Sequence, residues 1–135
     1  MGRGVLQLAM VCSLSGVLGA IITFSFGGWM ESLTLLVVAM AIDYVSGITA
    51  SIKDGRGLNS LFGAWGLARK GLMLLVILLA HRIDILLGTS HATMGAAIYF
   101  YIANELISII ENYGRIGLPL PERLRKIIEV LKNKK

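Results

Sequence analysis

The chain has 135 residues, 56% of them hydrophobic, and a formal net charge of +5 at pH 7. A soluble domain of this length is usually less than half apolar, so the composition indicates an integral membrane protein with room for about four spans of roughly 20 residues. Lysine and arginine cluster at the ends of apolar runs instead of accompanying aromatic residues in a polar domain, which argues against nucleic acid as a partner. We therefore expect a single membrane domain over residues 1–135.

Apolar runs define the expected helices. They cover about residues 5–26, 33–52, 71–88 and 91–110. No charged residue lies between Arg3 and Glu31, and the first run is about 33 Å long as a helix, enough to cross a bilayer. The third run is apolar over a shorter length, because His81, Arg82 and Asp84 interrupt it near its end. The pattern predicts an all-α membrane protein with four transmembrane helices, or three if the third run does not span.

Small residues mark two helix faces that other helices can approach closely. Four-residue spacing places such residues on one side of a helix, where they allow tight packing. The packing candidates are Gly16, Gly19, Ala20 and Gly47. The single cysteine, Cys12, lies among them and is expected to be a buried packing residue.

A carboxylate, Asp43, lies near the middle of the second run. Placing an uncompensated carboxylate there costs about 2.5–3.5 kcal/mol on insertion scales, so its side chain should point inward. The fourth run carries a polar stripe at helical spacing. With Glu111, which lies next to this stripe, the candidates for pore lining or interhelical packing are Tyr101, Glu105, Ser108, Glu111 and Asn112. The sequence leaves open whether these groups meet Asp43 or face water.

A glycine-rich basic turn is expected between the second and third runs. Its basic residues are predicted to anchor the cytoplasmic side of the membrane: Lys53, Arg56, Arg69 and Lys70. The turn lacks the GK[ST] signature of a phosphate-binding loop, so no nucleotide is expected. No cofactor and no metal site is expected either, because His81 and His91 lack the spacing of a helical ligand pair.

The C-terminal residues 115–135 form a basic tail. Pro119 and Pro121 end the fourth helix, and an apolar stripe then predicts a short amphipathic helix. The stripe consists of Leu124, Ile127, Ile128 and Leu131. The remaining faces are mostly basic, which favours contact with an anionic leaflet. With four spans, the positive charge places both termini in the cytoplasm.

Four sequence blocks resemble the toxin-secretion/phage-lysis holin family. They are D-Y-x-x-G-x-x-x-x-x-K at 43–53, N-S-x-x-G-x-x-G-x-x-R-K at 59–70, N-E-x-x-S-x-x-E-N at 104–112 and G-L-P-x-P-x-x-L at 117–124. The resemblance implies a protein of the bacterial inner membrane that forms homo-oligomers. It also implies lesions that release an endolysin or a toxin and time host-cell lysis, without required direct contact with the released protein.

The residues alone leave two other classes of protein possible. Inward carboxylates would also suit a small ion channel or transporter subunit, and exposed helix faces would suit a holin antagonist that binds membrane helices. No nucleophile–base pair and no paired catalytic carboxylates can be defended, so the chain is not expected to be an enzyme.

Overall fold

A computed structural model describes residues 2–57 and 59–133, without the side chains of residues 131 and 132. These residues form five helices: α1 (Gly2–Phe26), α2 (Glu31–Lys53), α3 (Ser60–Leu87), α4 (Ala92–Ile116) and α5 (Glu122–Asn133). Among the described residues, α1, α2 and α4 are long and apolar enough to cross a membrane. The predicted all-α membrane fold with a short C-terminal helix is therefore confirmed.

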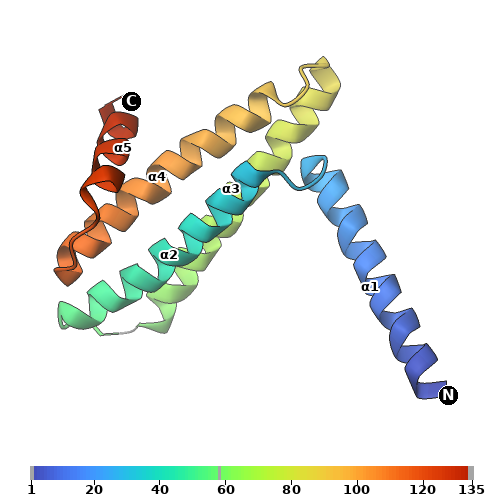
Figure 1. The fold of residues 1–135 in the computed structure, drawn as a ribbon, viewed down its shortest axis with the longest axis horizontal. Helices are drawn as coiled ribbons and strands as arrows, with labels where there is room; N and C mark the ends of the chain where they lie inside the picture. Colours follow the sequence, from blue (N-terminus) through green and yellow to red (C-terminus); the bar gives the residue numbers. More distant parts are fainter. Residues whose placement is uncertain (1, 58, 134–135) are drawn as a thin grey trace.

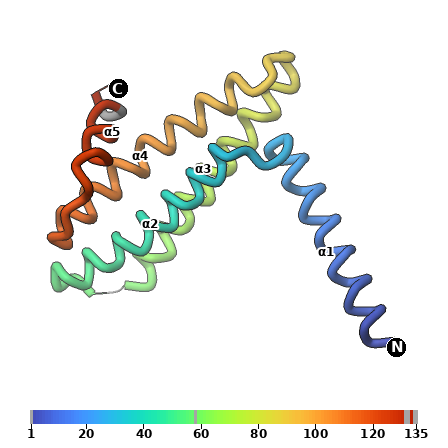
Figure 2. The backbone as a smooth tube through the Cα atoms, in the orientation of Figure 1, coloured from blue at the N-terminus to red at the C-terminus, as the bar shows by residue number. Residues whose placement is uncertain are grey.

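Helices α2, α3 and α4 lie side by side in one bundle (Figure 1). Helix α4 packs against α2, α3 and α5, and α5 folds back along it after the turn that follows Ile116. Helix α1 leaves the bundle at one end and extends away from it, as the backbone trace shows (Figure 2). Its helix contacts fall on α3.

Helix α3 is not among the three span candidates, although the third apolar run was expected to cross the membrane. Its uninterrupted apolar segment is short, because Lys70 precedes it and His81 follows it. The helix itself is about 42 Å long at 1.5 Å per residue, and it runs antiparallel to α2 and α4 in contact with both. A fourth crossing therefore remains a prediction.

The basic turn is much shorter than the sequence analysis placed it, because residues 60–70 are the first turns of α3. Asn59 caps this helix by accepting a hydrogen bond from the Leu61 N–H at 3.0 Å. Two glycines of the expected turn, Gly63 and Gly66, lie inside the helix and face Tyr44 of α2. A Cβ at Gly63 would lie 3.1 Å from the Tyr44 hydroxyl oxygen. These glycines therefore permit close helix contact and do not loosen a turn.

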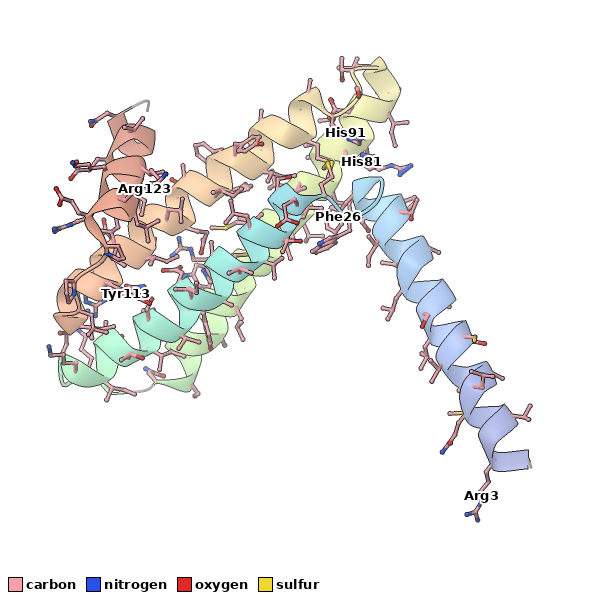
Figure 3. All side chains as sticks on the ribbon, in the orientation of Figure 1. Arg3, Phe26, His81, His91, Tyr113 and Arg123 are labelled. Carbon is pink, nitrogen blue, oxygen red and sulfur yellow. The ribbon has the colours of Figure 1, made fainter. Side chains whose placement is uncertain are left out.

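The joint between α1 and the bundle lies where Phe26, at the end of α1, comes close to His81 and His91 (Figure 3). Gly27 has a φ of +72°, and a Cβ there would lie 2.7 Å from the His81 ring. That ring stacks on the His91 ring, with 6.0 Å between the ring centroids. Arg82 donates to the Phe24 carbonyl at 2.9 Å, and its guanidinium lies over the Phe24 ring. The direction of α1 is thus fixed at its C-terminal end only.

Apolar side chains fill the half of the bundle next to this joint. The buried cluster comes from the N-terminal halves of α2 and α4 and the C-terminal half of α3: Leu33, Leu36, Met40, Ile77, Ala80, Met94, Ile98 and Ile102. Five of these residues are 0% exposed: Leu33, Leu36, Ile77, Met94 and Ile98. This half of the bundle is a dry core.

Asp84 joins α3 to the start of α4. Its carboxylate accepts hydrogen bonds from the Thr89 hydroxyl at 2.5 Å and from the N–H groups of Thr93 and Met94 at 2.9 and 2.8 Å. The last two are free donors of the first turn of α4, so Asp84 acts as a cap from another helix. His81 shares a helix face with Asp84, but its ring stacks on that of His91, and the Asp84 carboxylate bonds Thr89, Thr93 and Met94.

Asp84→Ala should lower the free energy of unfolding in mixed micelles by about 2–4 kcal/mol, because buried donors lose a charged acceptor. Chemical unfolding followed by circular dichroism would measure the change. The control is Lys126→Ala, whose pair with Glu122 is exposed and 3.5 Å long; it should change stability by less than about 0.5 kcal/mol. Equal effects of the two substitutions would contradict the capping role.

Candidate functional site

An ion-pair triad lies inside the bundle at the middle of α2 and α4. The Lys70 ammonium is 2.7 Å from Asp43 Oδ2 and 2.7 Å from Glu105 Oε2. The exposed fractions of the three side chains are 14% for Lys70, 16% for Asp43 and 4% for Glu105. One base on α3 therefore joins one acid on each of the two helices that flank it.

Asn112 extends this network by two helical turns along α4. Its Nδ2 donates towards Asp43 Oδ1 at 2.9 Å, the Asp43 carbonyl at 3.1 Å and Ser46 Oγ at 3.0 Å. Gly47 allows this approach, because a Cβ there would lie 3.5 Å from the Asn112 nitrogen. Each oxygen of the Asp43 carboxylate thus has its own donor, Lys70 for one and Asn112 for the other.

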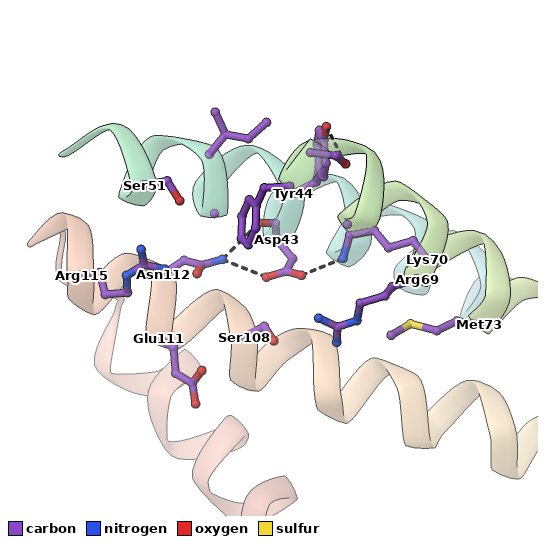
Figure 4. Close-up of a pocket in the computed structure, with 15 residues that line it drawn as sticks. Asp43, Tyr44, Ser51, Arg69, Lys70, Met73, Ser108, Glu111, Asn112 and Arg115 are labelled. Atoms are coloured by element: carbon purple, nitrogen blue, oxygen red, sulfur yellow. Dashed lines mark hydrogen bonds and ion pairs between the residues drawn. The ribbon is translucent and has the colours of Figure 1, made fainter. Parts of the chain in front are cut away.

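A polar cleft of about 190 Å³ runs from the triad towards the end of the bundle that holds the α2–α3 turn (Figure 4). Asp43 and Lys70 line its inner end, and Ser51, Phe62 and Arg115 line its outer end. The volume has room for several water molecules, and the polar lining offers them partners.

Ionic contacts hold the outer end together. Arg115 of α4 donates twice to Asp54 Oδ2, at 3.0 and 2.7 Å, and Lys53 donates to the Ile116 carbonyl. Arg69 and Glu111 also line the cleft, and both side chains are exposed. Positive and negative groups therefore alternate along the walls.

The cleft and the dry core occupy opposite halves of the same bundle. The dry core begins where the triad ends, with Met40 one turn before Asp43 and Ile102 one turn before Glu105. The side chains of Leu33, Leu36 and Ile98 then fill the remaining length. A path for water from the turn end therefore stops at Lys70.

The structure brings together several residues that the sequence analysis singled out and separates others. Asp43, Glu105 and Asn112 meet in the network, and Ser108 and Glu111 line the cleft beside them. Tyr101 instead packs against the dry core, with its ring 5.5 Å from that of Phe100.

The basic residues of the expected turn lie in different environments. Lys53 and Arg56 lie at the exposed end of the bundle, and Arg69 lies at the cleft. Lys70 points into the interior, away from the position of a surface anchor, because α3 begins ten residues before it. Periodicity counted from Asn59 instead of Gly71 is the signal that would have placed Lys70 opposite the two acids.

The predicted packing face of α1 has no neighbour within the chain. Side chains added at Gly16 or Gly19 would meet no atom within 4 Å, and Ala20 and Cys12 are exposed. Among the described residues, no group of three or more His, Cys, Asp or Glu side chains is placed to hold a metal ion.

Apolar helices with a charged network and a polar cleft between them define a helical membrane protein with a polar interior. The bacteriophage holin family matches residues 20–133, and the chain belongs to this family. The family has a holin-type membrane function.

Relatives cover most of the chain. An uncharacterized protein of Listeria monocytogenes, Lmo0128, is 44% identical over 82% of this chain and 78% of its own length. The uncharacterized protein BH0965 of Halalkalibacterium halodurans is 40% identical over 87% of this chain and 90% of its own. An uncharacterized 14.9 kDa protein of Clostridium perfringens, encoded in the nagH 3′ region, is 40% identical over 87% and 89%. No solved structure matches.

Because the cleft extends to one end of the bundle only, cysteines introduced at its wall and in the dry core should react at different rates. The test uses a Cys12→Ala background. Ser108→Cys should react with a charged, membrane-impermeant thiol reagent roughly tenfold or more faster than Ile98→Cys, because a thiolate forms readily only where water reaches it. Proteoliposomes treated from one side at a time would also show that labelling of Ser108→Cys proceeds from the side of the α2–α3 turn. Equal rates at the two positions would contradict the division of the bundle.

Proposed function

We propose that this chain is a holin that assembles in the bacterial inner membrane into lesions. The lesions release an endolysin or a toxin and so set the time of host-cell lysis. Membership of the holin family carries this proposal, and the charged network inside an otherwise apolar bundle supports it. A polar interior becomes useful when helices separate and their polar faces line water.

The proposed topology has four crossings with both termini in the cytoplasm. The antiparallel contact of α3 with α2 and α4 supports a fourth crossing, because the triad ties all three helices together at one depth. Lys53 and Arg56 would then lie on the cytoplasmic side, as the positive-inside rule expects. Helix α5 carries basic side chains beside an apolar face, which suits contact with an anionic leaflet.

Homo-oligomers would form through α1. This helix is apolar on all sides and is exposed along nearly its whole length. In a membrane, lipid or a second copy covers it, and the open space above Gly16 and Gly19 lets another helix approach closely. We propose that α1 joins copies while the other helices supply the polar surface.

Opening requires α3 to leave α2 and α4. Separation breaks both ion pairs of Lys70 and exposes the acids of the two flanking helices. Hydrogen bonds to charged groups contribute about 1.5–3 kcal/mol each, so the network opposes opening by several kcal/mol. A membrane potential adds about 2.3 kcal/mol per charge moved across 100 mV, so depolarisation can shift this balance.

The cleft also supports a second candidate, a small ion channel that conducts without killing. The water path stops at the dry core in a single chain, so conduction would need a partial opening that keeps the bundle intact. A holin antagonist would use the same exposed α1 to bind another holin. The three functions differ in what expression does to a cell.

Expression in Escherichia coli together with a cytoplasmic endolysin should give normal growth, a delay, and then abrupt lysis. An uncoupler added during the delay should trigger lysis at once, because it removes the membrane potential. Turbidity and oxygen uptake would record both events. A steady ion leak without release of endolysin would indicate the channel, whereas no effect alone but delayed lysis beside another holin would indicate the antagonist.

Asp43→Asn should shorten the delay before lysis, because Lys70 loses one of its two carboxyl partners, a loss of about 1–3 kcal/mol for the closed bundle. It should also change the response to an uncoupler. Asp54→Asn is the matched control, since its pair with Arg115 is about one-third exposed and lies at the end of the bundle. If Asp43→Asn inserts normally and keeps both the lysis time and the uncoupler response, the triad does not control opening.

A further inference from the structure

The triad carries one more negative charge than positive. Lys70 supplies one ammonium, and Asp43 and Glu105 supply two carboxylates, all of them largely buried. Lys70 is equally close to both acids, at 2.7 Å, so it cannot be assigned to one of them. With all three groups in their usual charge states, the middle of the bundle would hold an uncompensated negative charge.

The other charged groups around the cleft do not remove this excess. On α4, Arg115 is paired with Asp54 of α2. Arg69 of α3 and Glu111 of α4 line the cleft with opposite signs and are exposed, so together they add no net charge. On α2, the Tyr44 hydroxyl donates to the Gly63 carbonyl at 3.3 Å. The excess therefore stays at the triad.

An uncompensated charge in a membrane interior is costly, and a buried group usually avoids it by changing its protonation state. The cleft supplies the route, since it extends from the turn end of the bundle to Asp43 and Lys70. The opposite route is closed by the dry core. Protons would therefore exchange with one side of the membrane only.

The hydrogen bonds distinguish the two acids. Asp43 accepts a hydrogen bond from Lys70 on one carboxylate oxygen and from Asn112 on the other. Glu105 accepts from Lys70 and is the most buried of the three side chains, with 4% of its side chain exposed. Burial favours the neutral form of a carboxyl group.

We propose that the triad is a proton-binding site, occupied by one proton that rests on Glu105 and is exchanged through the cleft from the side of the α2–α3 turn. In the uptake step, hydronium in the cleft gives its proton to the carboxylate pair. An O–H bond forms on the acid, an O–H bond of hydronium breaks, and water remains in the cleft. The triad then carries no net charge. This property does not depend on lesion formation.

Infrared difference spectroscopy of the protein in lipid bilayers tests the proposal, because a protonated carboxyl group has its own C=O band. At pH 7 the wild type should show a band equal to about one protonated carboxyl per chain, as charge balance requires. Glu105→Gln should abolish it, since Asp43 and Lys70 then balance each other, and Asp43→Asn should abolish it for the same reason. Lys70→Met should roughly double it, because two acids then lack a base.

Glu31→Gln is the matched control and should keep the full band, since Glu31 is exposed at the first residue of α2 and does not line the cleft. The proposal is overturned if the wild type shows no band at pH 7, or if the band persists in both Glu105→Gln and Asp43→Asn. Spectra recorded in potassium and in choline salts show whether a proton or an alkali cation neutralises the triad. A band that appears only in choline would mean that an alkali cation occupies the site, and this result would overturn the proposal. Circular dichroism of each variant checks its fold, and the wild-type spectrum decides the matter even if Lys70→Met misfolds.

Discussion

The contact of Lys70 with two acids is the interaction on which the rest of the bundle depends. A salt bridge in a low-dielectric interior is strong only when its geometry is good and its remaining polar atoms are satisfied. Here one ammonium bonds acids of both neighbouring helices, and Asn112 bonds the outer oxygen of Asp43. Since these side chains come from α2, α3 and α4, the network sets the depth of each helix relative to the other two. Sliding any one helix by a turn would leave buried charges without partners.

This constraint also explains why the bundle has two unlike halves. Beyond the triad in one direction, Leu36, Ile77 and Ile98 fill the space between helices without polar atoms. In the other direction, glycines and small polar residues leave a cleft, and Tyr44 can pack against Gly63 and Gly66. A bundle with a polar interior along its whole length would conduct ions. A bundle with an apolar interior along its whole length would hold no charged side chains. Under the proposed function, this division would keep a single chain closed, and the polar faces that line an opened lesion would already be present.

The sequence predicted the acids of this site better than their base. Asp43 and Glu105 were found because a carboxylate inside an apolar run is costly, and because polar residues on the fourth run recur at helical spacing. Lys70 was read as part of a turn, because four glycines in the preceding stretch are typical of irregular structure. Two of those glycines accommodate a tyrosine from α2, a contact that no local pattern can reveal. Buried acids still needed a base, but the sequence does not say which one, since Lys53 is nearer than Lys70 to Asp43 along the chain.

Helix α1 is held in place differently from the helices of the bundle. Among the described residues, its joint to the bundle combines a glycine at φ +72°, the stacked rings of His81 and His91, and the hydrogen bond from Arg82 to the Phe24 carbonyl. This joint fixes the C-terminal end of α1 and leaves the rest of the helix to contact lipid or another chain. The bundle is held by charges that favour one closed arrangement, whereas α1 is an apolar surface that accepts neighbours on any side. In the proposed holin, α1 would join copies and the bundle would open, so the two tasks would rest on different helices.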